Sequence, residues 1–359
     1  MEIHQVLVAA SPGDAITNAA LDLRDLLRDV CPSEVYARFY DARVADEVRP
    51  LREFRHRQAA HPEDNILIFH ASIGEPEVFT FLQERPERLV IVHHNISPAE
   101  PFLPYDPAFA GLLDGGRREL AALARRAELA LADSRFNAHD LLSLGYRNVR
   151  VAPLILDVDR LQRVEPHEPT VHHLDENVKG PVALFVGQLL PHKRPDFLIQ
   201  AYHALVTYLE PDTHLIVVGA SRLPRYATAI DLLVKELNLP RAWLAGRVSD
   251  GQLSAFYRRA DLFFTASEHE GFCAPLLEAM AFRVPVLARS FAAIPETVGD
   301  AGVLLPADAG PLMAGEAMAE LIGNDRLRAG LVARGDERVR HFNLERARTA
   351  VLGHLLEML

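Results

Sequence analysis

Cysteine is scarce in this chain, since Cys31 and Cys273 are the only two among 359 residues. Two thiols so far apart in the sequence build neither a disulfide scaffold nor a cysteine-based metal site, so we expect reduced thiols in a cytoplasmic protein. Long apolar runs are also missing. The first apolar stretch, residues 6–10, is ended by Pro12 and Gly13. It is too short for a signal peptide, and no run reaches the ~20 residues that cross a bilayer.

Excess positive charge is missing as well. The chain carries 38 Lys and Arg against 49 Asp and Glu, a formal net charge of −11. Binding to nucleic acid needs clustered basic charge, so we exclude nucleic acid as a partner. Arginines do cluster in residues 49–57 and 117–126, but acidic residues are interleaved with them. We interpret both clusters as solvated helix faces, with peripheral membrane contact as the less favoured alternative.

Apolar segments bounded by turns alternate with segments of helical periodicity, which predicts parallel, doubly wound sheets, and the length predicts two domains. The predicted strands are residues 3–10, 65–69, 89–92, 129–132 and 148–151, then 182–186, 214–218, 242–244, 262–266, 284–288 and 303–305. The predicted helices are residues 14–28, 76–83, 106–127 and 134–144, then 195–209, 223–237, 250–260, 275–282, 310–323 and 344–358. Residues 157–180 show no periodicity and are interpreted as the linker between the domains.

One stretch, residues 267–280, has the features of a ligand site. It joins an apolar strand to a helix that Pro275 is suited to open, because proline fits the first helical turn. The expected N-cap, Ala274, has no side-chain oxygen, so the N–H groups of Leu276 and Leu277 are expected to be left for a ligand. An anion such as phosphate is favoured there by the orphan amides and the helix dipole.

Two carboxylates flank this helix start, Glu270 in the approach loop and Glu278 on the helix. Together they suit a nucleotide sugar: the helix start would hold the diphosphate, Glu278 would accept hydrogen bonds from ribose hydroxyls, and Glu270 would reach the sugar. The alternative is an acidic loop before an amphipathic helix, with both glutamates merely solvated. These residues alone leave the two interpretations open.

The sequence E-G-F-C-A-P-L-L-E-A-M-A that starts at Glu270 is followed by Val284-Pro-Val and by Ile294-Pro-Glu-Thr-Val-Gly-Asp-Ala-Gly302. In combination these motifs resemble the retaining glycosyltransferases of family 4, glycosyl transferases group 1, over most of the C-terminal half. The resemblance implies an α/β protein of the GT-B architecture, with two doubly wound, Rossmann-like domains facing each other across a cleft. Residues 1–165 would form the acceptor domain and residues 166–343 the nucleotide-sugar domain, while the last segment, 344–359, would pack back on the first domain.

The segment Gly187-Gln-Leu-Leu-Pro-His-Lys193 resembles the Gly-Arg-Leu-x-x-x-Lys segment of this family, whose arginine and lysine neutralise the diphosphate. A fixed cation is useful there because the leaving nucleoside diphosphate gains charge as the glycosidic bond breaks. Lys193 matches the lysine, whereas Gln188 stands in place of the arginine. Either the neighbouring Arg194 compensates, or donor binding is weaker or shaped differently.

The resemblance also assigns residues to the donor outside this segment. Val248, after a predicted strand, would meet the nucleobase through its backbone, and Phe272 and Cys273 belong to the donor-binding motif itself. Gly13 would let the backbone approach a sugar or phosphate, although it stands alone where the family usually has a glycine pair, so a plain turn glycine is the alternative. The segment His93-His-Asn-Ile-Ser-Pro98 resembles a His-Asn-Ile-Thr-Pro segment of some members. The sugar-contacting histidine is assigned to His94, with His93 as the competing choice.

We therefore predict a retaining glycosyltransferase that moves a sugar from a nucleoside-diphosphate sugar to a hydroxyl of a saccharide, a lipid-linked saccharide or a small glycosylated metabolite. His94 and Glu270 are its candidate catalytic residues, and by analogy the leaving phosphate takes the acceptor proton. No metal or other cofactor is expected, since no Asp-x-Asp lies at a strand end. The alternative is a nucleotide-sugar epimerase or a non-catalytic nucleotide-sugar-binding protein of the same fold. A dinucleotide oxidoreductase is set aside because no Gly-x-Gly-x-x-Gly follows the first strand of either half.

Overall fold

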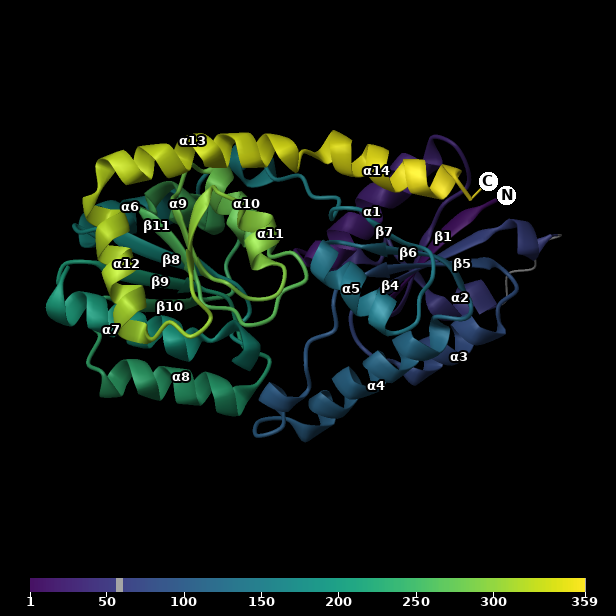
Figure 1. The fold of residues 1–359 in the computed structure, drawn as a ribbon, viewed down its shortest axis with the longest axis horizontal. Helices are drawn as coiled ribbons and strands as arrows, with labels where there is room; N and C mark the ends of the chain where they lie inside the picture. The colour runs from purple at the N-terminus through teal and green to yellow at the C-terminus, as the bar shows by residue number, and fades with distance from the viewer. Residues whose placement is uncertain (56–60, 359) are drawn as a thin grey trace. The chain divides into compact units, whose positions relative to one another are not determined.

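A computed structural model describes residues 1–55 and 61–358 of the chain (Figure 1). Arg57 of the first arginine cluster and Leu359 of the last predicted segment lie outside the described residues. The chain divides into two compact units, Met1–Leu156 with Phe342–Leu359 (unit 1) and Asp157–His341 (unit 2). No helix among the described residues is both long enough and apolar enough to span a bilayer.

Unit 1 is built on a seven-stranded sheet of order β3-β2-β1-β4-β5-β6-β7, in which every recorded strand pair is parallel. The strands are β1 Ile3–Ala10, β2 Val35–Tyr40, β3 Arg49–Pro50, β4 Ile66–Ala71, β5 Arg88–His93, β6 Ala127–Ala132 and β7 Val149–Val151. The helices are α1 Ala15–Arg28, α2 Leu51–Arg55, α3 Pro76–Glu84, α4 Pro107–Leu123, α5 Arg135–Ser143 and α14 Leu344–Leu356, with short 3₁₀ turns η1 Ala42–Val44, η2 Pro62–Asp64 and η3 Glu100–Phe102. The strand order reverses between β1 and β4, which is where doubly wound sheets bind ligands at their carboxyl ends.

Unit 2 is built on a six-stranded parallel sheet of order β10-β9-β8-β11-β12-β13, whose order reverses between β8 and β11. The strands are β8 Val182–Val186, β9 His214–Val218, β10 Ala242–Gly246, β11 Leu262–Thr265, β12 Val286–Arg289 and β13 Gly302–Leu305. The helices are α6 Glu168–Asn177, α7 Pro195–Tyr208, α8 Pro224–Glu236, α9 Asp250–Arg259, α10 Ala274–Ala281, α11 Ile294–Val298, α12 Pro311–Gly323 and α13 Asp325–His341, with 3₁₀ turns η4 Arg160–Arg163 and η5 Pro191–Lys193.

The central strands of both sheets are buried on both faces, as expected for parallel strands covered by helices. All residues of β4 and β11 are buried, and Phe263 and Phe264 of β11 are fully so. Burial of each such side chain contributes about 1.5–3 kcal/mol, so these strands anchor the loops that follow them. The prediction of two doubly wound α/β sheets is confirmed.

Residues 157–180 are not the irregular segment that the sequence predicts, because α6 lies within them. Only Thr170 and Leu174 of this ten-residue helix are buried, so it leaves almost no apolar periodicity. The helix is held to the start of α9 by a hydrogen bond from the backbone N–H of His167 to the carbonyl of Gly251, 2.9 Å long.

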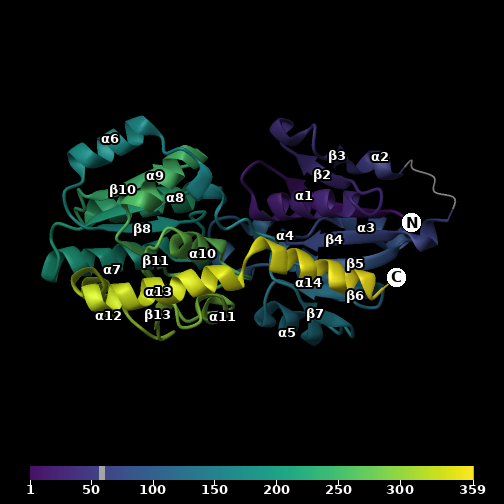
Figure 2. The same ribbon diagram turned by 90° about the horizontal axis from the view of Figure 1, so that it is seen from above.

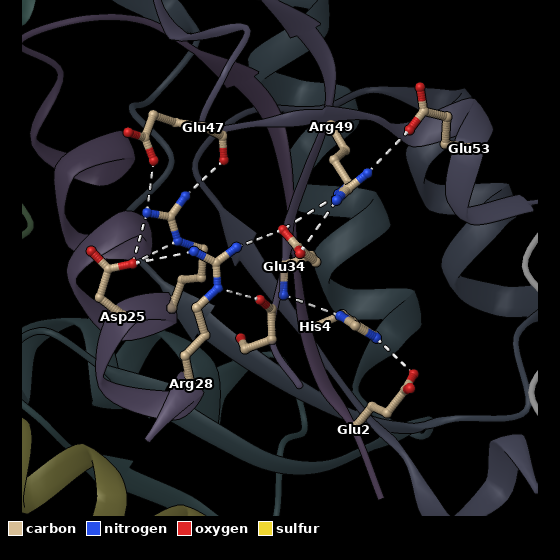
Figure 3. A network of polar contacts seen from close by, with 10 residues as sticks. Glu2, His4, Asp25, Arg28, Glu34, Glu47, Arg49 and Glu53 are labelled. Carbon is tan, nitrogen blue, oxygen red and sulfur yellow. Dashed lines mark hydrogen bonds and ion pairs between the residues drawn. The ribbon is translucent and has the colours of Figure 1, made fainter. Parts of the chain in front are cut away.

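Ion pairs hold together the amino-terminal ends of β1, β2 and β3 in unit 1 (Figure 3). The Glu34 carboxylate lies 2.9 Å from Nη2 of Arg28 and 3.4 Å from Nε of Arg49, and its backbone N–H donates to Nδ1 of His4. Because Nδ1 of His4 accepts, Nε2 carries the proton and donates to Glu2, 3.0 Å away. These ion pairs lie at the amino-terminal ends of the strands. Doubly wound sheets bind ligands at the opposite, carboxyl ends.

The chain runs from α13 into α14, which belongs to unit 1 (Figure 2). Ala347, Val351 and Leu355 are the buried residues of α14. Val351 lines a cavity of about 20 Å³ together with Ala19 and Leu23 of α1. The last helix therefore packs on the first one.

Candidate functional site

The loops that follow β8 and β11 meet at the reversal of strand order in unit 2. The first loop runs from Gly187 to Lys193 and the second carries Glu270. The backbone N–H of Glu268 in the second loop donates to the carbonyl of His192 in the first, 2.8 Å away. The fold thus brings together two motifs that lie more than seventy residues apart in the sequence.

Lys193 and Glu270 form an ion pair at the centre of this site. Nζ of Lys193 lies 2.5 Å from Oε1 of Glu270, and the two side chains are 20% and 9% exposed. Burial is the largest single influence and lowers the pKa of Lys193, but Glu270 and Cys273 together raise it by more, so the net shift is upward and the lysine remains charged. Burial also raises the pKa of the Cys273 thiol well above its usual value, and the charge of Glu270 adds to this effect. The cluster therefore consists of one ammonium, one carboxylate and one protonated thiol.

The start of α10 differs from the prediction in two respects. The N-cap is Cys273 and not Ala274, which is the first helical residue, and the N–H of Leu276 donates to the carbonyl of Cys273 at 3.1 Å. The expectation of an Ala274 cap and a free Leu276 N–H is therefore wrong, because the left-handed backbone of Cys273 (φ 68°) folds the carbonyl back under the first turn. In residues 1–55 and 61–358, no side chain caps this helix end.

Neighbouring residues fix the loop that leads into α10. The Thr297 hydroxyl donates to the carbonyl of Phe272 at 2.6 Å, which anchors the loop to α11. Phe272 and Leu277 are buried. The left-handed conformation of Cys273 costs about 1 kcal/mol for a residue other than glycine, and these contacts hold it in place.

Glu278 projects from the second turn of α10 and is held by Tyr257 of α9. The Tyr257 hydroxyl donates to Oε2 of Glu278 at 2.8 Å, and the tyrosine ring is fully buried, stacked 5.1 Å from Phe282. Burial raises the pKa of Glu278, and the hydrogen bond from Tyr257 and the charge of Arg160 lower it by less, so the net shift is upward. Sequence reasoning missed Tyr257 and Arg160, since neither lies in a recognisable motif.

Gln188 is exposed at the beginning of the β8 loop, and Val248 lies half-buried between β10 and α9. Arg194 does not compensate for the glutamine in this structure, because its guanidinium lies 2.9 Å from Asp196 and also contacts Glu268. Two carboxylates thus neutralise Arg194. Lys193 is left as the cation of this loop that faces the α10 side of the site.

In unit 1, His94 follows β5 and both of its ring nitrogens are engaged. Nδ1 lies 2.8 Å from Oδ2 of Asp133, and Nε2 lies 2.8 Å from Nδ1 of His70. The His94 side chain is 3% exposed. A direct contact between a ring nitrogen of His94 and a sugar would therefore require one of these hydrogen bonds to be replaced. Sequence reasoning predicted neither Asp133 nor His70 as a partner of His94.

Gly13 lies in the exposed turn between β1 and α1 with φ 75°, a conformation that favours glycine. A side chain at this position would meet no atom within 4 Å, so the turn is open to a ligand. The adjacent helix end is capped by Asp14, whose carboxylate accepts from the N–H of Thr17 at 2.8 Å. That carboxylate disfavours a phosphate here and leaves an uncharged ligand group as the better fit.

His93, the competing choice, points to a different carboxylate. Its Nε2 lies 3.0 Å from Asp140, which also accepts from Arg117 at 2.7 Å. Burial raises the pKa of Asp140, but the hydrogen bonds from His93 and Arg117 lower it by more, which leaves the pKa well below its usual range. His93 thus has a structural role in joining β5 to α4 and α5.

Replacing Asp140 with asparagine is expected to change the acid stability of the protein. Because the folded-state pKa is depressed, the carboxylate stabilises the fold above about pH 4 and this contribution is lost as pH falls further. We expect Asp140→Asn to cost about 1 kcal/mol at neutral pH, a small value because Arg117 is 35% exposed and water screens the pair. Melting temperatures measured across pH should converge for the two proteins toward about pH 2; a gap that persists unchanged at low pH would contradict this.

Among the described residues, no group of three or more His, Cys, Asp or Glu side chains is arranged to hold a metal ion. Three of the charged groups in unit 2 lie beside the start of α10, namely the Lys193–Glu270 pair and Glu278. They provide one cation and two carboxylates beside a helix start, an arrangement that can bind a group with both phosphate and hydroxyl functions.

Comparison with known proteins matches residues 170–338 to the family model described as Glycosyl transferases group 1. The D-inositol 3-phosphate glycosyltransferase of Xylanimonas cellulosilytica is 28% identical over 234 residues, 62% of this chain and 55% of that protein. The O-antigen chain mannosyltransferase B of Escherichia coli is 30% identical over 173 residues, 47% of this chain and 44% of that protein. The chain spans about half the length of these relatives.

Solved structures resemble the whole chain. The crystal structure of Anabaena HepE in complex with UDP and glucose has a TM-score of 0.78 at 19% identity and covers 100% of both chains. That of WaaG, a glycosyltransferase involved in lipopolysaccharide biosynthesis, has a TM-score of 0.72 at 16% identity and covers 97% of this chain and 98% of the other. At such identities the likeness concerns the fold, and it confirms the predicted GT-B fold.

Proposed function

Because residues 170–338 match the family model described as Glycosyl transferases group 1, we propose that the chain is a member of this family and transfers a sugar, with retention, from a nucleoside-diphosphate sugar to a hydroxyl acceptor. The observation that carries the proposal is the Lys193–Glu270 pair at the reversal of strand order in unit 2. Lys193 is the last residue of η5, and Glu270 lies in the loop that leads to α10, the helix that carries Glu278. Residues 166–343 would then bind the donor and residues 1–165 the acceptor, completed by the C-terminal segment.

In the proposed donor site, each side chain binds a different part of the nucleotide sugar. Lys193 and the first turn of α10 hold the diphosphate, and Glu278 accepts hydrogen bonds from the ribose. The diphosphate replaces Glu270 as the partner of Lys193, which releases the Glu270 carboxylate for the sugar hydroxyls. Gln188 donates a hydrogen bond where an arginine would donate two and add a charge. Val248, Phe272, Cys273 and Leu277 shape the site around the donor.

For the reaction, we propose that Lys193 stabilises the charge that the leaving diphosphate gains as the glycosidic bond breaks. The acceptor hydroxyl attacks from the side of the leaving group, and its proton passes to the departing phosphate oxygen. Glu270 positions the sugar and His94 lies at the acceptor-side sheet. The acceptor is a saccharide, a lipid-linked saccharide or a small metabolite.

The decisive first experiment is a thermal-stabilisation screen with UDP-, GDP-, ADP- and TDP-sugars. A ligand that binds only the folded state at 100 times its Kd stabilises the protein by about 2.7 kcal/mol, which is a shift of several degrees. One base is expected to stand out from the others. If none of the four raises the melting temperature, the proposed donor site is wrong. If a nucleotide sugar binds but sugar products form without an acceptor, an epimerase is favoured instead.

Replacing Glu278 with alanine should weaken binding of the nucleotide found by that screen. Loss of a hydrogen bond to a charged group costs about 1.5–3 kcal/mol, so we expect the Kd measured by calorimetry to rise about 10- to 100-fold. Glu236→Ala, on an exposed position of α8, is the matched control and should leave the Kd unchanged. Equal affinities for Glu278→Ala and the control would remove Glu278 from the ribose site.

A further inference from the structure

A continuous chain of buried side chains crosses three neighbouring strand pairs of unit 1. Gln5 on β1 contacts His70 on β4, which contacts His94 after β5, which contacts Asp133 after β6; Figure 1 shows these four strands in one sheet. Gln5 and His70 are 0% and 2% exposed, and Asp133 is 5% exposed. Each contact is 2.8 Å long, so each must hold exactly one hydrogen between its two atoms.

The direction of the chain is set at Gln5. Its amide nitrogen donates to the carbonyl of Ala20 at 2.9 Å, and its oxygen faces Nε2 of His70 at 2.8 Å. Turning the amide over would bring its oxygen against the Ala20 carbonyl, where two acceptors would face each other in a buried place. The Gln5 oxygen is therefore the acceptor, and the proton of this contact sits on Nε2 of His70.

His70 carries only that proton. Burial lowers the pKa of His70 well below its usual value, and the charge of His94 lowers it further. Neither of its nitrogens faces a carboxylate. A neutral His70 protonated at Nε2 has a lone pair on Nδ1, so the proton between the two histidines belongs to Nε2 of His94.

The other nitrogen of His94 faces a carboxylate, which is an acceptor. Because Oδ2 of the Asp133 carboxylate lies 2.8 Å away and has no hydrogen to donate, Nδ1 must therefore also carry a hydrogen. We propose that Gln5 and His70 are positioning residues that hold His94 in the doubly protonated form, paired with the Asp133 carboxylate.

Among the described residues that line the cavity beside the chain, no other charged group competes for these protons. Besides His70, His94 and Asp133, these lining residues are all apolar, among them Val92, Leu131 and Val351. With a volume of about 20 Å³, the cavity has room for one water molecule. The protonation of His94 thus follows from the hydrogen-bond order that begins at the Gln5 amide.

The consequence for the reaction rests on the proposed function. A doubly protonated His94 has no lone pair on its ring and does not act as a general base. It acts as an oriented cation next to Asp133, fixed in place by two hydrogen bonds. This agrees with a transfer in which the acceptor proton goes to the leaving phosphate and not to a histidine.

The test uses ¹⁵N-labelled histidine in the full chain and records two-bond proton–nitrogen correlations at about pH 7.5, one unit above the ordinary pKa of histidine. His94 is identified by the signal that disappears in His94→Gln. The proposal expects two protonated ring nitrogens for His94 in the unaltered protein. A single protonated nitrogen would overturn it, whatever the activity of the enzyme.

Two variants at one position sharpen the test. In Gln5→Glu a buried carboxylate faces Nε2 of His70 and stabilises the cation on His70, which then donates from Nδ1, so His94 should lose one proton. In Gln5→Met the acceptor is gone, so His70 can move its proton to Nδ1 and His94 should lose one. His139→Gln, on the exposed face of α5, is the control and should leave the His94 signal unchanged. Two protonated nitrogens in folded Gln5→Met would also overturn the proposal; if that variant does not fold, the unaltered protein and Gln5→Glu decide.

Activity gives an independent reading once a donor and an acceptor are known. We expect Gln5→Met to lower kcat at least 10-fold with little change in the donor KM, and to make kcat depend on pH where the unaltered enzyme does not. Gln5→Glu should likewise lower kcat, since the positive charge then lies on His70 and not on His94. The spectra remain decisive if the protein turns out to have another activity, so failure of the proposed function and failure of this inference are distinguishable.

Discussion

Replacing Lys193 with alanine is expected to lower kcat about 10²- to 10³-fold, the loss typical when one fixed group that stabilises developing charge is removed. Lys193 is the cation of the β8 loop that is not neutralised by two carboxylates, as Arg194 is, and the usual arginine of the motif is glutamine here. Among the described residues of this loop, no second cation is left to stabilise the charge of the leaving diphosphate. Steady-state kinetics with the identified donor measures the effect on kcat and on the donor KM separately.

Two further variants separate charge stabilisation from disturbance of the fold. Lys193→Ala leaves the Glu270 carboxylate, only 9% exposed, without its partner. Adding Glu270→Gln to it removes that stranded charge and should restore thermal stability but not turnover. Lys235→Ala, on the exposed surface of α8, is the matched control. A Lys193→Ala enzyme with kcat within about threefold of the control would contradict the assignment of Lys193 to the diphosphate.

Replacing Gly219 with alanine is expected to destabilise unit 2 by about 3 kcal/mol, at the upper end of the range for overpacking. Gly219 follows β9 with φ 137°, and an added Cβ would lie 1.9 Å from the carbonyl oxygen of Gly187 after β8. Both the backbone conformation and the space therefore require glycine. Since Gly187 precedes Gln188, the displaced loop should also bind the donor more weakly. Urea denaturation followed by a probe in unit 2 measures the stability change.

The control for this substitution is Gly323→Ala at the end of α12, where an added Cβ meets no atom within 4 Å. It should be neutral or slightly stabilising, because alanine is the better helix residue. A Gly219→Ala protein as stable as this control would show that the β8 and β9 loops separate more easily than their backbone contact indicates.

The strands were the most predictable part of the fold. The predicted bounds of β1, β8 and β9 agree with the structure to the residue, because strands buried on both faces are continuous apolar runs. By contrast, α13 was not predicted, since only Leu331 and Gly335 of its 17 residues are buried and its surface is strongly charged. A helix that buries so little leaves no periodic signal.

The candidate donor site was also predictable only in part. The loops after β8 and β11 could be identified because their motifs follow buried strands, and parallel sheets bring strand ends together. The ion pair of Lys193 with Glu270 could not be predicted. A local sequence pattern predicts the position of a residue in the fold, but not which of several nearby charged side chains it pairs with. Likewise the side chains linked to His94 come from β1, from β4 and from the loop after β6, and their order depends on strand register.

The placement of α14 in unit 1 bears on how this protein is made. A ribosome completes every residue of unit 2 before it produces the helix whose Val351 closes the cavity beside His94. Part of the apolar surface of unit 1 therefore stays uncovered until all of unit 2 has been synthesised. Truncation of the chain after His341 would therefore destabilise unit 1, although it leaves every residue of unit 2 in place.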